Sequence, residues 1–156
     1  MKLTIVNISN KMPDWVNSAC DEYLKRINHG KYSCKIIEVK ADKNSKKTAL
    51  ENMEQEAKKI ENALPKASYI IALDERGTNY DSIQFAHKLE KISLDNSSIS
   101  FIIGGADGIH PALRDKADLK ISLSKMVFPH ALVRVIILEQ IYRAISILEN
   151  HPYHRE

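Results

Sequence analysis

The stretch SISFIIGGADG, residues 98–108, joins a short apolar run directly to a loop with three glycines. Its first six residues include three isoleucines and a phenylalanine, which predicts a β-strand. Glycine adopts positive φ angles without strain and lets a ligand approach the backbone closely. The stretch therefore predicts a strand that ends in a tight turn or against a ligand.

Strands and helices alternate on both sides of this stretch. Strands are predicted at residues 3–8, 34–39, 68–73, 98–103 and 119–123. Helices are predicted at residues 13–27, 49–64, 81–92, 111–117 and 129–149. Gly30 is expected to end the first helix, and Asp81 with Gln84 to cap the third. The pattern predicts one α/β domain over residues 1–156, a mostly parallel sheet with helices on both faces.

The last predicted helix differs from the others in its apolar pattern. Between Ala131 and Leu138 it is apolar on nearly every side. Such a helix is buried on more than one face. We therefore expect it to pack against the sheet or against another subunit.

Three loops follow predicted strands at the carboxyl edge of the sheet, where parallel sheets bind ligands. They are LDERG at 73–77, GGADG at 104–108 and LSKMVF at 123–128. The glycine loop is not a dinucleotide or Walker motif, and D-x-x-G without a phosphate loop is no GTPase signature. Each glycine-containing loop alone is equally compatible with a plain turn, but three converging loops predict a pocket.

Composition indicates an ordinary globular protein, with 156 residues, 44% of them hydrophobic, and a net charge of +3. No stretch approaches the roughly 20 apolar residues of a membrane helix. The first residues are predicted to form a strand and not a signal peptide. Cys20 and Cys34 match neither a disulfide framework nor a zinc spacing, so a reducing cytoplasm is expected. The basic stretch Lys40–Lys47 is either a solvated loop or a contact for nucleic-acid phosphates.

The chain ends in HPYHRE, residues 151–156, which places two histidines, a tyrosine and an arginine at the terminus. His151 and His154, with His110 and His130, are potential metal ligands. No H-E-x-x-H motif or set of carboxylates accompanies them, so no metal is expected. The motif alone is also compatible with simple packing at the end of the last helix.

Four blocks together carry a resemblance along the whole chain: KMPDWV, IIGGADGI, LSKMVFPHALVRVIILEQIYRA and the terminal HPYHRE. In this order they are similar to the RlmH (YbeA) family of SPOUT-class methyltransferases. The resemblance implies S-adenosylmethionine-dependent methylation of N3 of a pseudouridine in 23S ribosomal RNA, on the ribosome. It also implies a C-terminal trefoil knot and a homodimer whose active site lies where the two knots meet.

The resemblance further implies which residues form the site. The implied cofactor contacts are Leu73, Gly104, Leu123, Ser124, Lys125, Met126, Val127 and Phe128. For the tail, the chemistry of the acceptor suggests the roles: His154 as the base for the imide proton, Arg155 to stabilise developing negative charge or to hold a flanking phosphate, and Tyr153 to stack on or hydrogen-bond the target base. Which of the three residues performs which role stays open. We expect the tail to dock beside the partner's cofactor loop.

Three other readings of the sequence stay open. The chain is compatible with a knotted methyltransferase that acts on another RNA, such as a transfer RNA. It is also compatible with a ribosome-associated protein that binds the cofactor without turnover. A metal-dependent hydrolase built on the histidines is the third reading, and it predicts inhibition by chelators.

Overall fold

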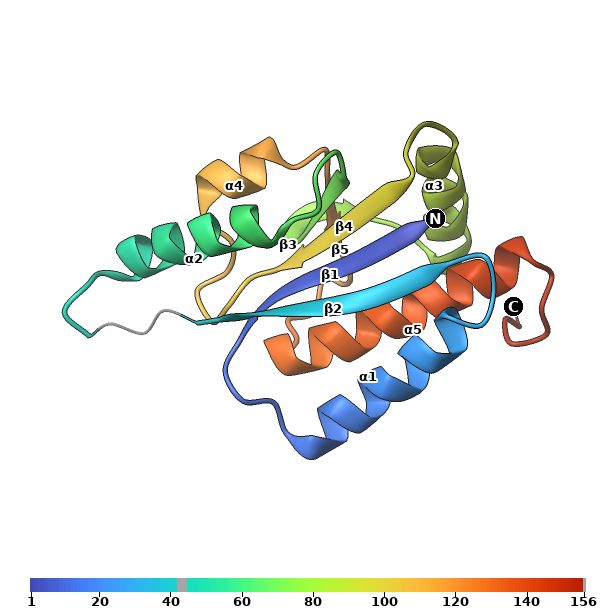
Figure 1. Cartoon of the computed structure of the whole chain (residues 1–156), viewed down its shortest axis with the longest axis horizontal. Coiled ribbons are helices and arrows are strands. Elements are labelled where there is room, and N and C mark those ends of the chain that lie inside the picture. Colours follow the sequence, from blue (N-terminus) through green and yellow to red (C-terminus); the bar gives the residue numbers. More distant parts are fainter. Residues whose placement is uncertain (42–44, 156) are drawn as a thin grey trace.

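The computed structural model describes residues 1–41 and 45–155 of the 156-residue chain. Five strands form one sheet in the order β2-β1-β4-β3-β5, and every neighbouring pair is parallel (Figure 1). The strands are β1 (Lys2–Ser9), β2 (Ser33–Lys40), β3 (Tyr69–Asn79), β4 (Ser98–Ile103) and β5 (Leu119–Ser122). The predicted α/β class and parallel sheet are confirmed.

Helices cover both faces of the sheet (Figure 1). They are α1 (Asp14–Ile27), α2 (Ala49–Ala63), α3 (Ser82–Asp95), α4 (Pro111–Lys116) and α5 (His130–Leu148). Helices α1, α3 and α5 share one apolar core with the sheet, and α2 and α4 share the other. In β4, Ile99, Phe101 and Ile103 face the first core and Ile102 faces the second, as the two-residue period of a strand requires.

The predicted cap of α3 and the predicted end of α1 agree with the structure, but a different residue from the one predicted ends α1. Asp81 and Gln84 form the predicted capping box, in which the Asp81 side chain accepts from the Gln84 N–H at 2.7 Å and the Gln84 side chain accepts from the Asp81 N–H at 2.9 Å. Helix α1 does not end through Gly30. The Asn28 amide instead donates to the Leu24 carbonyl and exchanges two hydrogen bonds with the Cys34 backbone, which ties the end of α1 to β2.

Strand β3 is longer than the sequence predicts. Residues 74–79, expected to be a loop, continue the strand after a bulge between Leu73 and Thr78, and the second part pairs again with β5. Gly77 lies inside the bulge, where a β-carbon would stand 2.7 Å from backbone atoms of Ile121. The prediction of a loop is wrong here, because Gly77 permits the close approach of β3 to β5 and does not end the strand.

Helix α5 carries a buried charge that the apolar pattern hides. Arg134 is 1% exposed, and its guanidinium donates to Glu38 at 2.6 Å and to the Ser9 hydroxyl at 3.1 Å. The oxygen of the Asn7 amide accepts from the same guanidinium in the orientation that satisfies both groups. These partners lie toward the carboxyl ends of β1 and β2. The interactions therefore fix the first half of α5 against that edge of the sheet.

The remaining faces of α5 differ in burial. Ile137, Leu138 and Ile141 are fully buried, which confirms the expected packing against the sheet. Leu132 and Ile136 are only half-buried and lie one helical turn apart on the same face. One chain thus leaves an apolar strip of α5 partly exposed.

Several surface predictions are partly described by the structure. Across residues 1–41 and 45–155, no helix is long and apolar enough to cross a membrane. Cys20 and Cys34 are buried free thiols. In the basic stretch, Lys46 and Lys47 are exposed ahead of α2, and Lys43 lies outside the described residues.

The bulge yields a stability prediction. Gly77→Ala should lower the free energy of unfolding by about 1–3 kcal/mol, because the added methyl group overlaps the backbone of β5. Gly30→Ala is the matched control, since the nearest atom would be 4.0 Å away. Urea unfolding of both variants measures the difference. Equal stability of the two variants would contradict the close approach of the strands.

Candidate functional site

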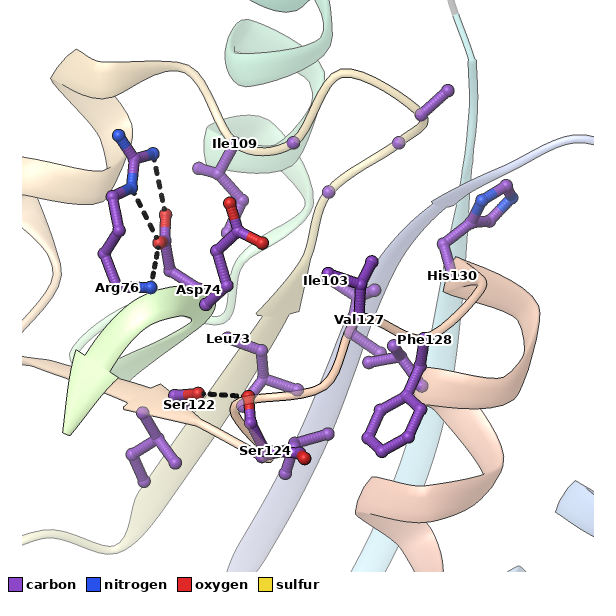
Figure 2. Close-up of a pocket in the computed structure, with 18 of the residues that line it drawn as sticks. Leu73, Asp74, Arg76, Ile103, Ile109, Ser122, Ser124, Val127, Phe128 and His130 are labelled. Atoms are coloured by element: carbon purple, nitrogen blue, oxygen red, sulfur yellow. Dashed lines mark hydrogen bonds and ion pairs between the residues drawn. The ribbon is translucent and has the colours of Figure 1, made fainter. Parts of the chain in front are cut away.

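A cavity of about 310 Å³ opens at the bulge of β3 and at the carboxyl ends of β4 and β5. Its walls come from the three loops singled out in the sequence and from the first turns of α5 (Figure 2). The volume is at the lower end of the range typical of small-molecule sites. The predicted pocket at this edge of the sheet is therefore present.

The glycine loop after β4 has a shape that depends on its missing side chains. A β-carbon on Gly104 would stand 2.5 Å from the Gly108 carbonyl carbon. Gly108 has a φ of 86°, and its N–H donates to the Gly105 carbonyl at 3.0 Å. The loop therefore folds back on itself and presents backbone to the cavity.

The loop after β5 is organised around Ser124. The Ser122 hydroxyl donates to the Ser124 carbonyl at 2.9 Å (Figure 2). The Ser124 hydroxyl accepts from the Met126 N–H at 2.9 Å. This bend leaves Met126 75% and Val127 80% exposed at the cavity. Both side chains therefore offer apolar surface to a ligand in the cavity.

A charged cluster stands on the opposite wall (Figure 2). The Asp74 carboxylate, with its side chain 6% exposed, accepts from the Arg76 N–H at 2.8 Å and from the Arg76 guanidinium at 3.1 and 3.3 Å. Arg114 of α4 lies 3.6 Å from the same carboxylate. Burial alone would raise the pKa of Asp74, but the hydrogen bonds and charge of Arg76 outweigh it and the pKa is lowered. Asp74 thus stays ionised and fixes the Arg76 side chain.

Seven of the eight residues expected to contact a cofactor line this one cavity: Leu73, Gly104, Leu123, Ser124, Met126, Val127 and Phe128. Lys125 is exposed and is not among the lining residues. Asp74, Arg76 and His130 also line the cavity and were not among the expected cofactor contacts. LDERG pointed to the first two by position, whereas His130 was considered only as a potential metal ligand.

The tail residues gather at the other end of α5, beside which the C-terminus lies in Figure 1. The Tyr153 hydroxyl donates to Glu139 at 3.0 Å, and its ring contacts Tyr142 with centroids 4.5 Å apart. Both ring nitrogens of His154 are buried and have no hydrogen-bond partner within residues 1–41 and 45–155. Arg155 is exposed.

Within one chain the tail and the cavity do not meet. Of the described tail residues 151–155, none lines the cavity. On α5, His130 and Val133 face the cavity, whereas Glu139 holds the tail. Val133 and Glu139 are separated by about 9 Å along the helix axis and by roughly 240° around it. The two groups of predicted site residues therefore occupy different sides of the same helix.

The histidines do not assemble a metal site in the part of the chain that the structure describes. There, no group of three or more His, Cys, Asp or Glu side chains is arranged to hold a metal ion. His110 caps α4 by accepting from the Ala112 N–H at 3.1 Å. His151 accepts from the Tyr153 N–H at 3.2 Å. Both side chains therefore have structural partners.

Comparison with known proteins decides the family. The sequence profile of the family described as "Predicted SPOUT methyltransferase" matches residues 1–154. The chain belongs to the SPOUT methyltransferase family. This match confirms the resemblance seen in the four sequence blocks.

Two relatives that are named as methyltransferases match at least 99% of this chain. A protein of Methylobacillus flagellatus named ribosomal RNA large subunit methyltransferase H is 46% identical over 157 residues and is covered completely, as is this chain. A Burkholderia mallei protein of the same name is 44% identical over 156 residues, with 99% of each chain covered. The methyltransferase assignment is thus confirmed at full length.

A solved structure supports the SPOUT fold alone. A "probable methylase family protein" from Haemophilus influenzae aligns with a TM-score of 0.58 at 14% identity, covering 99% of this chain and 70% of that one. The α/β SPOUT fold is confirmed, and the C-terminal trefoil knot stays a prediction.

The charged cluster gives a pH-dependent prediction. Asp74→Asn should lower the free energy of unfolding at pH 7, because it removes the charge that accepts hydrogen bonds from Arg76. The loss should be only about 1 kcal/mol, because the Arg76 side chain is exposed and solvent weakens the ion pair. The pKa of Asp74 is lowered by folding, so its contribution exists above the unfolded pKa of about 3.9 and is lost as pH falls through the folded pKa.

Urea unfolding at pH 7 and at pH 3 measures this effect, with Asp107→Asn as the control. Asp107 lines the same cavity but is exposed. The difference in the free energy of unfolding between wild type and Asp74→Asn should be smaller at pH 3 than at pH 7. A gap of equal size at both pH values would mean that packing and not charge is responsible.

Proposed function

We propose that this protein transfers the methyl group of S-adenosylmethionine to N3 of a pseudouridine in 23S ribosomal RNA, on the assembled ribosome in the cytoplasm. The observation that carries the proposal is the convergence of seven expected cofactor contacts on one cavity, in a chain that matches the SPOUT family over residues 1–154. The relatives named ribosomal RNA large subunit methyltransferase H support the choice of RNA.

The residues of the cavity fit S-adenosylmethionine. Leu73, Val127 and Phe128 supply apolar surface suited to an adenine ring. The folded-back glycine loop and the bend at Ser124 supply backbone N–H and C=O groups, which suit the polar edges of the nucleoside. When bound, the cofactor supplies an electrophilic methyl group on a sulfonium.

The tail supplies the groups that the acceptor base needs. N3 of pseudouridine is an imide nitrogen that carries a proton at neutral pH, so a base must remove this proton for N3 to become a nucleophile. His154 is suited to accept it, because neither ring nitrogen has a partner within the described part of its own chain. Arg155, which is exposed, would stabilise the negative charge that develops on the carbonyl oxygens of the ring.

A homodimer would bring the tail of one chain to the cavity of the other. In one chain they lie on different sides of α5, so an intramolecular site would require the tail to leave its contacts with Glu139 and Tyr142. The half-buried Leu132 and Ile136 offer an apolar strip for a second copy. A site shared between two copies needs no such rearrangement, and we adopt it.

Recognition of the RNA would rest in part on basic surface of this domain. Exposed Lys46 and Lys47 precede α2 and belong to the basic stretch Lys40–Lys47. Two copies of this stretch in a dimer would add phosphate contacts whose strength falls with salt. The assembled ribosome would supply the rest of the specificity by its shape.

Methyl-labelled S-adenosylmethionine tests the reaction and its substrate together. We expect label in large-subunit RNA of ribosomes that contain the target pseudouridine, and much less in ribosomes with uridine at that position. Free transfer RNA serves as the alternative acceptor. Preferred labelling of transfer RNA, or cofactor binding without any labelling, would each replace the proposal by one of the alternative functions.

Truncation tests the role of the tail. Deletion of residues 153–156 should leave the Kd for S-adenosylmethionine within about twofold and lower kcat at least 100-fold, the usual scale of a lost proton-transfer group. His154→Ala should reproduce most of the loss, with exposed His87→Ala as the matched histidine control. Calorimetric titration and single-turnover transfer measure the two quantities. Retained transfer after truncation would contradict the role of the tail.

A further inference from the structure

We infer that Tyr153 is a positioning residue, held in a socket formed by Glu139, Tyr142 and Arg143 of α5, and that this socket sets where His154 and Arg155 are presented. The inference rests on the proposed function of the tail and changes the expected role of Tyr153. The sequence suggested that Tyr153 meets the target base. In the structure the Tyr153 side chain instead contacts Glu139 and Tyr142 of its own chain.

The hydroxyl of Tyr153 is fully engaged. It donates to Glu139 Oε1 at 3.0 Å, and the same oxygen accepts from Arg143 at 2.7 and 2.9 Å. Glu139 Oε2 accepts from Gln140 at 2.7 Å. The Glu139 side chain is 19% exposed and that of Arg143 27%, so these bonds are largely shielded from water. A charged acceptor in such surroundings makes a strong hydrogen bond to a phenol.

The ring of Tyr153 is also engaged. It meets Tyr142 edge to face, with centroids 4.5 Å apart and planes at 80°, and the Arg143 guanidinium lies 5.1 Å from its centroid. Pairs of this geometry are favourable beyond simple area burial. Burial first, and then hydrogen bonds with Tyr23 and Glu139, raise the pKa of Tyr153, so the phenol remains a hydrogen-bond donor. A ring held in this way is not available to stack on an RNA base.

The backbone before Tyr153 is fixed as well. Asn150 adopts a φ of 55°, which turns the chain back at the end of α5. The His151 N–H donates to the Ser146 carbonyl at 2.8 Å, and the His151 ring accepts from the Tyr153 N–H at 3.2 Å. Tyr153 is therefore held through its backbone, its ring and its hydroxyl.

Fixing Tyr153 constrains the residues that follow it. The Cα atoms of Tyr153 and His154 are about 3.8 Å apart across a trans peptide, so the socket limits where the His154 ring can stand. Socket residues 139, 142 and 143 lie on one face of α5 at i, i+3 and i+4. Because α5 also contributes His130 and Val133 to the cavity, one helix carries both the socket of the tail and part of a cavity wall. Preorganisation of this kind is worth large factors in rate.

A double-mutant cycle tests the socket with two readouts. Tyr153→Phe removes only the hydroxyl, and Glu139→Gln weakens its acceptor. The first readout is the rate at which carboxypeptidase releases Arg155 and His154 from the intact protein, with no cofactor or RNA present. The second is the split between kcat and the KM for S-adenosylmethionine. Tyr69→Phe, at the far end of β3 from the cavity, is the control for loss of a tyrosine hydroxyl.

We expect Tyr153→Phe to accelerate tail release several-fold and to lower kcat about tenfold with KM unchanged, since small misplacements of a reacting group are costly. Glu139→Gln should do the same, and the double variant should lose little more than either alone. Tyr69→Phe should behave as wild type in both readouts.

If the effects of Tyr153→Phe and Glu139→Gln were additive, or if Tyr153→Phe left the rate of tail release unchanged, the socket would be contradicted. Tyr153 would then be expected to contact the substrate. The release assay involves no methyl transfer. It therefore stays decisive even if the proposed reaction on 23S ribosomal RNA is wrong, and the two failures are distinguishable. Thermal unfolding of each variant checks that a faster release reflects the tail and not global instability.

Discussion

The buried Arg134 is the constraint on which the site depends. Removing a guanidinium from water is costly unless its donors are satisfied, and here Asn7, Ser9 and Glu38 satisfy them at the carboxyl ends of β1 and β2. The arginine thus fixes the helix relative to the sheet edge where the cavity opens. The tail, through Glu139, and the part of the cavity wall formed by His130 and Val133 take their places from this helix.

The cavity itself results from close backbone contacts that only glycine permits. Gly77 lets the bulged β3 run against β5, and Gly104 lets its loop fold onto Gly108. These contacts leave the bulge of β3 and the carboxyl ends of β4 and β5 open to one space. The charged pair of Asp74 and Arg76 closes one side, and the loop at Ser124 closes the other. Backbone therefore surrounds the proposed cofactor site, while the proposed reacting groups belong to the tail.

Much of this arrangement follows from the sequence, because its local patterns and its global fold agree. Apolar runs and capping residues predicted nearly every element within three residues of its observed bounds. The exceptions are tertiary in origin. The extension of β3 depends on pairing with β5, which no local pattern records. Arg134 and Glu139 lie in a helix that reads as simply apolar, so their partners on β1, β2 and the tail could not be predicted. The seven expected cofactor contacts that line the cavity were accessible through family resemblance and not through spacing alone.

The central claim, a site shared between two copies, is tested most directly by complementation. One chain carries Leu73→Trp, which fills the cavity and should abolish cofactor binding. The other lacks residues 153–156 but keeps its cavity. Each alone should be inactive. Equal mixtures, allowed to exchange subunits, should recover about a quarter of wild-type transfer, because half of the dimers would be mixed and each would hold one complete site. No recovery in a mixture proven to contain mixed dimers would contradict the account and place the tail at the cavity of its own chain.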